Sequence, residues 1–508
     1  MEESIEFNDD DNNQDHYDVI IIGGGLTGLT AGYYLLNKNV NLSLMIIESK
    51  DEIGGRCNNI NNGFYGHTFQ NNFMNLLNNL NLPIIYGRKS EYKKLTLHVK
   101  NNKLVNGGDD ESSIISSQVR YFIKSLELSC KKKNFKEYTK DEYSKYLASL
   151  SVNDYINGTI FSSRARLICR SYISLICGIS NLNNVSCLWL FVMLNYSGGF
   201  YKRLNYLFDN NTRFFIEGGI GQVINRLRNE ILEKNGSINY SESVKKINQD
   251  DIGIKITTSL KTYKCNYVII AVPPPESSSI VIESTNNDKN LLNFIKTQPF
   301  YFSEPSIYFE LTYKSPFWIN NYSGSVMTIF NKKVNLKLCY DASQEYKELN
   351  LLAGFINESE NLFSGKINLF KALNQSFATK EAGKFLNYTE INCNSTINVL
   401  KPCSVTNHHN PLLNPTQKIY FAASEYSKTN PGTADGAIGA GEHVACLLLH
   451  YARPQALEVY EIMKYIPQKG YQPKKKVYTQ FKYIHSIILF TNLAILLTLI
   501  WKTYASKK

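Results

Sequence analysis

Three glycines near the N-terminus constrain the fold of this chain more than any other feature, because they follow the spacing Gly23-x-Gly25-x-x-Gly28. The residues before them, 18–22, form a short continuous apolar run that is typical of a buried parallel strand. Residues 29–36, which follow the glycines, have the pattern of a helix. A glycine-rich turn between such a strand and such a helix predicts the first half of a strand–helix–strand unit.

The chemistry of this turn is that of a phosphate-binding loop. Gly23 permits the tight turn, Gly25 lets the backbone approach a pyrophosphate, and Gly28 lets the helix pack close to the strand. The positive end of the helix dipole favours the phosphate charge. Residues 42–47 predict a second strand, and Glu48 ends it about 20 residues beyond the glycines, where an acidic side chain binds ribose hydroxyls. The joint pattern predicts a dinucleotide-binding site.

Two more glycines and an arginine distinguish between the dinucleotides. Gly54, Gly55 and Arg56 follow Glu48 within one short loop. The glycines bring the backbone near the cofactor, and the arginine can pair with a phosphate. This combination favours FAD over NAD.

Segments far along the chain have the same character. Residues 266–272 predict another buried strand, which three prolines at 273–275 end. Residues 418–424 predict a strand, 425–432 a turn-rich loop and 434–449 a long helix. Their separation predicts one dinucleotide domain that is built from several segments.

Several longer motifs occur in a fixed order along the chain. They are 48–56, 184–189, Gly198-Gly199, 215–222, 267–274, the Y-K-x-P-F-W segment 313–318, 419–425, Gly432 and Gly436-Ala437. Through these motifs the sequence resembles the flavin monoamine oxidase family over nearly its whole length.

The resemblance implies an α/β fold: a Rossmann-like FAD-binding domain of the glutathione-reductase-like kind, a mixed-sheet substrate domain, and a C-terminal transmembrane helix. The FAD-binding domain would be discontinuous. The expected boundaries are 17–85, 210–290 and 395–455 for the FAD-binding domain, 86–209 and 291–394 for the substrate domain, and 456–508 for a basic, loop-like linker with a tail anchor.

The resemblance also implies contacts to FAD beyond the glycine loop. Val244 would touch the adenine through its backbone. Glu425 would lie in the turn beside the flavin, and the helix N-terminus between Gly432 and Ala437 would face the pyrimidine edge of the isoalloxazine. Helix N–H groups stabilise the negative charge that a reduced flavin gathers at that edge.

The substrate side departs from the family pattern. The position at which monoamine oxidases have a lysine near flavin N5 is Tyr308, and one wall of the family's aromatic cage falls at Thr433. The tryptophan upstream of the family's flavin-attachment cysteine is also missing, and Asn392 takes its place. Tyr65 matches a pocket tyrosine of the family, although it is equally well explained as a core aromatic. Tyr65, Tyr308 and Thr433 are therefore the pocket candidates, and no catalytic side chain is assigned.

Cys403 is the nearest candidate for covalent attachment of the flavin. It lies closer to the last motif than the family spacing requires, and its neighbours Pro402 and Ser404 differ from those of the family. Cys393 is the one near alternative. The prediction is tight FAD binding, with a covalent link not favoured.

The predicted function is FAD-dependent oxidation of an amine by oxygen, which gives an aldehyde, hydrogen peroxide and ammonia. One alternative is a polyamine oxidase, or another FAD oxidase or desaturase on the same fold. A second alternative is a flavin-binding membrane protein that has lost turnover, because the family's lysine and cage residues are missing. The amine is not specified by the sequence, and a homodimer is left open.

Charge and cysteine content exclude other classes. The net charge is +11, but the lysines are spread along the chain and no nucleic-acid motif accompanies them, which argues against nucleic-acid binding. Ten cysteines occur without CxxC pairs, so no metal site is expected. The N-terminus lacks the apolar run of a secretory signal.

The far C-terminus predicts a membrane anchor. Residues 483–501 carry no formal charge, and their length is near the minimum for a helix that crosses a bilayer. Lysines flank this segment on both sides. We therefore expect a tail anchor that leaves the catalytic part in the cytosol, and the resemblance favours the mitochondrial outer membrane.

Overall fold

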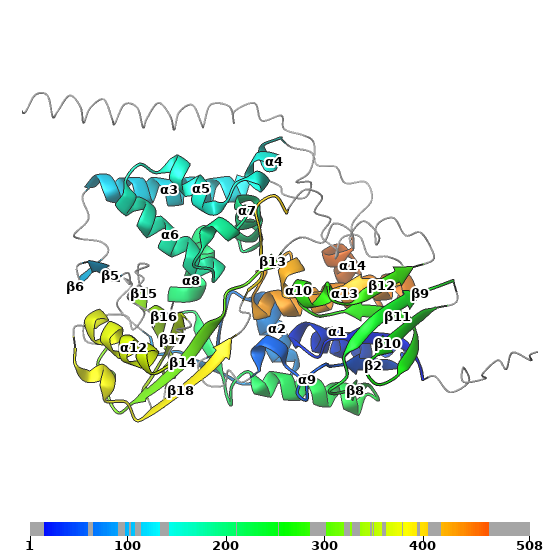
Figure 1. The fold of residues 1–508 in the computed structure, drawn as a ribbon. Coiled ribbons are helices and arrows are strands. Elements are labelled where there is room, and N and C mark those ends of the chain that lie inside the picture. Colours follow the sequence, from blue (N-terminus) through cyan, green and yellow to red (C-terminus); the bar gives the residue numbers. More distant parts are fainter. Residues whose placement is uncertain are drawn as a thin grey trace, which may run out of the picture.

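The structure is a computed structural model, in which two groups of elements lie at opposite ends of the molecule (Figure 1). One end holds the largest sheet with helices α1, α9 and α13, and the other holds a second sheet with helices α3 to α8 above it. The structure describes residues 15–58, 64–89, 97–100, 103–106, 113–132, 142–209, 211–251, 253–284, 301–319, 326–327, 336–345, 348, 350–357, 362–377, 379–393, 397–404 and 418–466.

The largest sheet has the strand order β12-β9-β10-β11-β1-β2-β8, and β20 also pairs with β11. Its strands are β1 (His16–Ile22), β2 (Leu44–Ile47), β8 (Ser237–Asn239), β9 (Val244–Gln249), β10 (Ile254–Thr258), β11 (Thr262–Ile270), β12 (Val281–Ser284) and β20 (Ile419–Phe421). The pairs of β1 with β2 and β11 are parallel, whereas β10 is antiparallel to both neighbours. Continuous apolar runs form these central strands because both faces of the sheet are covered.

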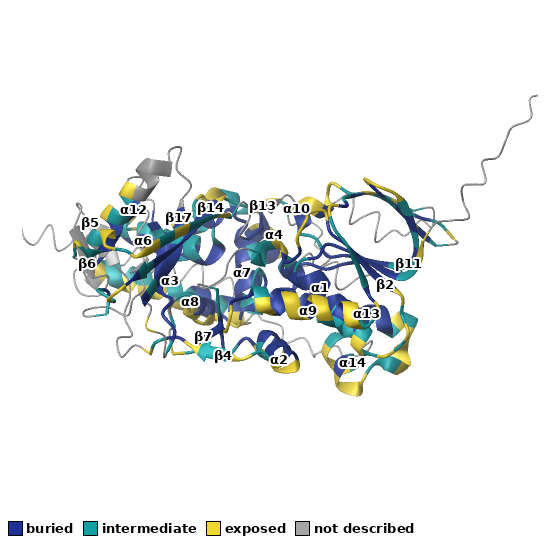
Figure 2. Cartoon of the chain, turned by 90° about the horizontal axis from the view of Figure 1, so that it is seen from below, coloured by how far each residue is buried: buried dark blue, intermediate teal, exposed yellow. Residues whose placement is uncertain are grey.

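Helices cover this sheet and complete the predicted strand–helix–strand unit. They are α1 (Leu26–Asn37), α2 (Asn71–Asn79), α9 (Gly221–Glu233), α10 (Pro274–Ser277), α13 (Ala434–Ala452) and α14 (Val459–Tyr465). Figure 2 shows that α1 is mostly buried and that α9 alternates buried and exposed faces. The strands and helices that were expected around the glycine loop and near residues 266–272 and 418–449 are confirmed.

One expectation for the linker differs from the structure. Residues after 455 were expected to be loop-like, but α14 packs on α13, with the ring of His443 stacked on that of Tyr465. A salt bridge of 2.7 Å between Lys38 and Glu461 holds the same helix to α1. The apolar and aromatic residues of α14 explain the helix, which the basic composition around it concealed.

The second sheet has the order β15-β16-β17-β14-β18. Its strands are β14 (Ser306–Tyr313), β15 (Val326–Met327), β16 (Leu336–Asp341), β17 (Asn350–Asn357) and β18 (Asn387–Cys393), and α12 (Leu362–Ser376) precedes β18 in the chain. All the described pairs are antiparallel, so the mixed sheet is the larger one and not this one. A short connection between β16 and β17 favours this arrangement, because parallel neighbours need a long crossover.

A group of helices packs above the second sheet. It contains α3 (Ser113–Lys132), α4 (Glu142–Ser149), α5 (Val152–Thr159), α6 (Ser163–Cys177), α7 (Cys187–Tyr196) and α8 (Phe200–Phe208). Serine side chains cap three of them, since Ser151, Ser162 and Ser186 each accept a hydrogen bond from a backbone N–H of the first turn.

Short strands connect these groups. The sheet β3-β7-β4 consists of Tyr65–His67, Arg213–Ile216 and Ile84–Tyr86. Two further pairs are β5 (Leu97–Lys100) with β6 (Lys103–Asn106), and β13 (Tyr301–Phe302) with β19 (Val399–Leu400).

Across the part of the chain that the structure describes, no helix is long and apolar enough to cross a membrane. The segment that was predicted to do so, 483–501, lies outside the described residues.

Candidate active site

Two glycines of the Gly23-x-Gly25-x-x-Gly28 loop are required by the fold itself. Gly23 has a φ of 106°, and a side chain there would bring its Cβ within 2.8 Å of the carbonyl oxygen of Ala271. A Cβ on Gly28 would lie 2.0 Å from the carbonyl oxygen of Gly23. Both positions therefore exclude a side chain whether or not a ligand is bound.

Gly25 is different, because nothing in the protein requires a glycine there. Its φ of −74° and ψ of 175° suit any residue, and a Cβ would meet no protein atom closer than the Cα of Gly55, at 4.0 Å. The N-terminus of α1 begins beside it, with no side-chain cap and no acidic residue in the first turn. The missing side chain leaves open space at a helix N-terminus, which fits the pyrophosphate of a dinucleotide.

The two glycine loops lie against each other. Gly54 donates its N–H to the carbonyl oxygen of Gly24 at 2.9 Å, and Gly25 and Gly54 form an isolated parallel bridge. Gly55 therefore faces Gly25: it has a φ of 55°, and a Cβ on it would lie 3.2 Å from the Cα of Gly25, so the close approach of the two loops favours glycine at position 55.

Glu48 supports this loop from the end of β2. Its Oε2 accepts the N–H of Gly24 at 2.7 Å, and its Oε1 accepts the N–H of Lys50 at 3.0 Å. Val244, the first residue of β9, belongs to a segment that runs beside Glu48, since Glu242 donates its N–H to the carbonyl oxygen of Glu48 at 2.9 Å. The structure thus brings the predicted ribose and adenine contacts together.

Arg56 and Glu425 form an ion pair across 369 residues of sequence, with Nη1 and Oε1 2.6 Å apart. Arg56 Nη2 also donates to Oε2 of Glu425 at 3.1 Å, and Asn398 donates to Oε1 at 2.8 Å. The Glu425 side chain is 2% exposed and that of Arg56 is 29% exposed. The pair ties the loop after β2 to the turn after β20.

The charge of Glu425 is stabilised in place. Burial is the strongest influence on its pKa and would raise it, but Arg56, Asn398 and Ser424 together lower the pKa below its usual value. The neighbouring Cys57 has a pKa raised to about 11 by burial, so its thiol stays protonated at neutral pH.

The N-terminus of α13 lies next to this turn. Thr433 caps the helix through its hydroxyl, which accepts the N–H of Gly436 at 3.1 Å, and Gly432 donates its N–H to the carbonyl oxygen of Ser424 at 3.1 Å. Ala437 follows in the first turn, where its N–H bonds the carbonyl oxygen of Thr433. Thr433 therefore acts as the N-cap of α13. This role was not predicted when Thr433 was matched to a wall of the family's aromatic cage.

Tyr65 and Tyr308, the other two pocket candidates, belong to one buried aromatic cluster with Tyr340. The rings of Tyr65 and Tyr340 meet edge to face at 4.9 Å. Tyr308 is 1% exposed and donates its hydroxyl to Glu310 at 2.8 Å. Burial, and then the neighbouring Tyr340 and Glu310, raise the pKa of Tyr308, so this side chain stays neutral.

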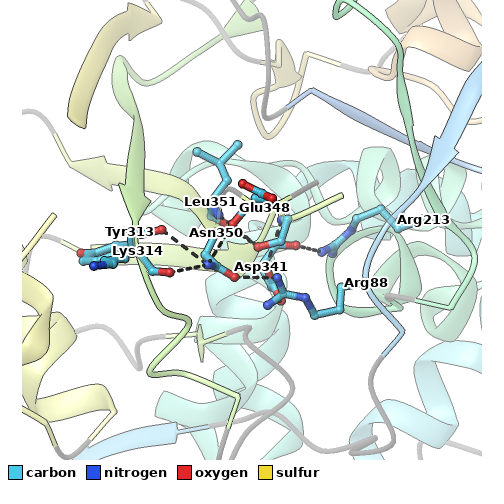
Figure 3. Close-up of polar contacts among 9 residues, drawn as sticks. Arg88, Arg213, Tyr313, Lys314, Asp341, Glu348, Asn350 and Leu351 are labelled. Carbon is cyan, nitrogen blue, oxygen red and sulfur yellow. Dashed lines mark hydrogen bonds and ion pairs between the residues drawn. The ribbon is translucent and has the colours of Figure 1, made fainter. Parts of the chain in front are cut away.

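A buried arginine lies inside this aromatic cluster. Arg213, on β7, is 1% exposed, and its guanidinium carbon lies 4.4 Å from the ring centroid of Tyr65 and 5.0 Å from that of Tyr340. It donates to the carbonyl oxygens of Asp341 at 3.1 Å and Leu207 at 2.9 Å, and Figure 3 shows the contact with Asp341. These contacts fix a positive charge between two aromatic rings.

Among the described residues, no contact brings Cys403 to the residues of this site. It lies exposed in the turn after β19, where its N–H bonds the carbonyl oxygen of Ala148 at 2.8 Å. Its Sγ lies 3.9 Å from the carbonyl oxygen of Ser149. The thiol is therefore placed against the end of α4.

Sequence reasoning missed the charged side chains of the aromatic cluster. Arg203, Arg213 and Glu310 are all at least nine-tenths buried. The sequence contained one signal for Arg203, because it is three residues from both Phe200 and Tyr206, a spacing that places it on their face of a helix.

Comparisons with known proteins agree with this geometry. A sequence model of the family described as flavin containing amine oxidoreductase matches residues 26–449. Amine oxidase [flavin-containing] B of Sus scrofa is 24% identical over 475 residues, which cover 85% of this chain and 86% of the relative. Amine oxidase [flavin-containing] A of Canis lupus familiaris is 23% identical over 459 residues, 84% of each chain.

Solved structures show the same fold. Cyclohexylamine oxidase from Brevibacterium oxydans IH-35A superposes with a TM-score of 0.75 at 19% identity, and covers 86% of this chain and 99% of its own. Putrescine oxidase bound to putrescine gives a TM-score of 0.72 at 17% identity, with the same coverage.

The chain therefore belongs to the family of flavin-containing amine oxidoreductases. It is an oxidoreductase of the amine oxidase class, and its cofactor is FAD.

Proposed function

We propose that this protein oxidatively deaminates an amine to an aldehyde, with release of hydrogen peroxide and ammonia. The observation that carries the proposal is the open space beside Gly25 at the N-terminus of α1, because the fold itself does not require a glycine at that position. FAD, when bound, accepts two electrons from the carbon next to the amine nitrogen and returns them to oxygen. The family relatives named above act in this class.

The residues that would hold the cofactor come from three parts of the chain. They are Gly23, Gly25, Gly28, Glu48, Gly55, Arg56, Val244, Glu425, Gly432 and Ala437. We infer that the large sheet, within 17–85, 210–290 and 395–455, forms the FAD-binding domain, and that 86–209 and 291–394 form the substrate domain. The separate hydrophobic core of the large sheet supports this division.

The substrate side favours the neutral amine, which is the form that can be oxidised. The aromatic cluster of Tyr65, Tyr308 and Tyr340 excludes water, and burial there penalises an ammonium ion. The guanidinium of Arg213 adds a like charge that penalises it further. No side-chain acid or base is needed for this step, so Tyr308 in the lysine's place is compatible with turnover.

We propose that FAD is held without a covalent bond. Cys403 is exposed and contacts the end of α4, and Pro402 restricts the chain before it. A thiol in that environment would have to leave its turn to reach the flavin ring.

We also propose that a C-terminal helix over residues 483–501 anchors the enzyme to a membrane, with the mitochondrial outer membrane favoured. The uncharged run with lysines on both sides supports this proposal. The amine and oxygen would then reach the enzyme from the cytosol.

The test combines cofactor content with turnover. Purified protein should be yellow, and a panel of neutral, carboxylated and poly-amines should be screened for peroxide. Gly25→Val should lose the flavin and keep the fold by circular dichroism, because its Cβ meets no protein atom closer than 4.0 Å. Gly158→Val is the matched control, since that exposed helix position is also open, and it should stay yellow.

The results distinguish an amine oxidase from a flavin-binding protein without turnover and from a protein that binds no flavin. A colourless, folded wild type that gains no flavin on reconstitution would refute the cofactor site. A yellow protein that yields no peroxide with any amine would instead support a flavin-binding protein without turnover.

A further inference from the structure

Arg203 is a buried cation next to the aromatic cluster. It lies on α8, is 6% exposed, and its guanidinium carbon is 5.6 Å from the ring centroid of Tyr206. Tyr206 in turn accepts, through its carbonyl oxygen, the hydroxyl proton of Tyr65 at 2.8 Å. Arg203 therefore borders the side of the site that contains the pocket candidate Tyr65.

Among the described residues, no carboxylate pairs with this arginine. Its Nη1 is buried and has no hydrogen-bond partner among the residues that the structure describes. Burial lowers its pKa, and the groups whose charge acts on it are Tyr206, Cys177 and Tyr65, with no carboxylate among them. A buried charge without a counter-ion is costly, so such a residue is retained where something else supplies the negative charge.

Two other arginines of this region have hydrogen-bond acceptors, although Nε of Arg213 and Nη1 of Arg88 are also buried without a partner among the described residues. Arg213 donates to two backbone carbonyls, and Arg88 donates to Oδ1 of Asn350 at 2.6 Å (Figure 3). The carboxylate of Asp341 lies 3.8 Å from Arg88. Glu310, an acidic residue of β14 next to the cluster, accepts the hydroxyl of Tyr308.

We propose that Arg203 binds a carboxylate of the substrate, so that the amine oxidised by this enzyme is an aromatic amine that also carries a carboxylate. This inference rests on the proposed function. The guanidinium matches a carboxylate through parallel N–H donors, and the rings of Tyr65, Tyr206 and Tyr340 suit an aromatic substrate. The phosphates of FAD are not the anion, because their predicted contacts lie around Gly25.

The kinetic test compares matched substrates in the holoenzyme. Phenylethylamine is neutral apart from its amine, phenylalanine adds a carboxylate on the reacting carbon, and the para-carboxylated phenylethylamine adds it at the far end. The better carboxylated amine should have a higher kcat/KM than phenylethylamine. In Arg203→Met the ratio of the two kcat/KM values should fall about 100-fold. In Arg203→Lys, which keeps the positive charge, the ratio should fall less.

Arg228→Met is the matched control, because it removes the same charge from the exposed face of α9 and should leave the ratio unchanged. A ratio that Arg203→Met does not change would overturn the proposal. The position of the preferred carboxylate then distinguishes an α-amino acid, whose oxidation and hydrolysis would give a 2-oxo acid in place of an aldehyde, from an amine with a distant carboxylate.

A binding measurement does not depend on turnover. Phenylpropanoate should perturb the flavin absorption of the holoenzyme at lower concentration than phenylpropanamide, and Arg203→Met should remove the difference. Binding of this kind without oxidation of any amine would support the anion site and refute the proposed function. Oxidation of amines without any dependence on Arg203 would refute the anion site alone.

Discussion

Removing Arg56 from the Arg56–Glu425 ion pair should lower the free energy of unfolding more than removing the charge of Glu425. Arg56→Met removes the main partner of a carboxylate that is 2% exposed, whereas Glu425→Gln leaves a guanidinium that is 29% exposed and can still be hydrated. Breaking a buried pair from one side costs about 3–5 kcal/mol. Asn398 and Ser424 still donate to Glu425, so we expect the lower end, about 3 kcal/mol, for Arg56→Met, and less for Glu425→Gln.

The assay is urea unfolding of the apoprotein at neutral pH, so that FAD does not contribute to the difference. The double variant Arg56→Met with Glu425→Gln should recover much of the loss, because no uncompensated charge remains. Lys384→Met is the control: its pair with Glu381 is exposed, and its loss should cost at most about 1 kcal/mol. A Glu425→Gln variant that is less stable than Arg56→Met would refute this reasoning.

The same pair predicts a pH dependence with a defined sign. The folded state lowers the pKa of Glu425, so the stability that its charge contributes is complete above the unfolded pKa and is lost as the pH falls through the folded pKa. Without Arg56, burial should instead raise this pKa. The difference in unfolding free energy between wild type and Arg56→Met should therefore be largest near neutral pH and shrink in acid, and a difference that grows in acid would contradict the assignment.

Three further changes test other parts of the molecule. Gly28→Ala places a Cβ 2.0 Å from a backbone oxygen, so it should destabilise even the apoprotein by about 3 kcal/mol or more in urea unfolding, unlike Gly25→Val. Deletion of residues 482–508 should give protein that leaves carbonate-washed membranes and still holds FAD; retention on the membrane would place the anchor elsewhere. Cys403→Ala should keep its flavin, and acid precipitation of the wild type should release flavin into the supernatant, whereas flavin that stays with the precipitate would indicate a covalent bond.

Local pattern was sufficient to predict the unit around the glycine loop. Residues 18–22 lie in β1, 29–36 in α1 and 42–47 largely in β2, because a continuous apolar run between breakers has few other stable conformations in a sheet that is covered on both faces. The glycines were predicted as a group, but the structure separates them. The fold requires Gly23 and Gly28, whereas Gly25 is free to hold a side chain.

Long-range contacts could not be predicted in the same way. Arg56 was expected at a phosphate, and in the structure its guanidinium pairs with Glu425, 369 residues away. The burial of Arg203 was difficult to predict for a similar reason. Tyr201 and Lys202 beside it are exposed, and two consecutive basic residues are typical of the surface of a helix. Arg203 becomes a buried cation because α8 packs against the segment around Tyr65 and against α6, which contributes Cys177.

The cofactor half and the substrate half of the site therefore depend on different parts of the chain. The cofactor half depends on backbone: glycines without side chains, a helix N-terminus and a pair of loops joined by backbone hydrogen bonds, which tolerate little change. The substrate half depends on side chains from α8, β7, β14 and β16, which can change without altering the backbone. In this chain those side chains are tyrosines with two buried arginines, so the proposed substrate site would disfavour a cationic amine and favour a negative group. A chain can thus keep the FAD-binding frame of its family while its pocket selects an amine of different charge.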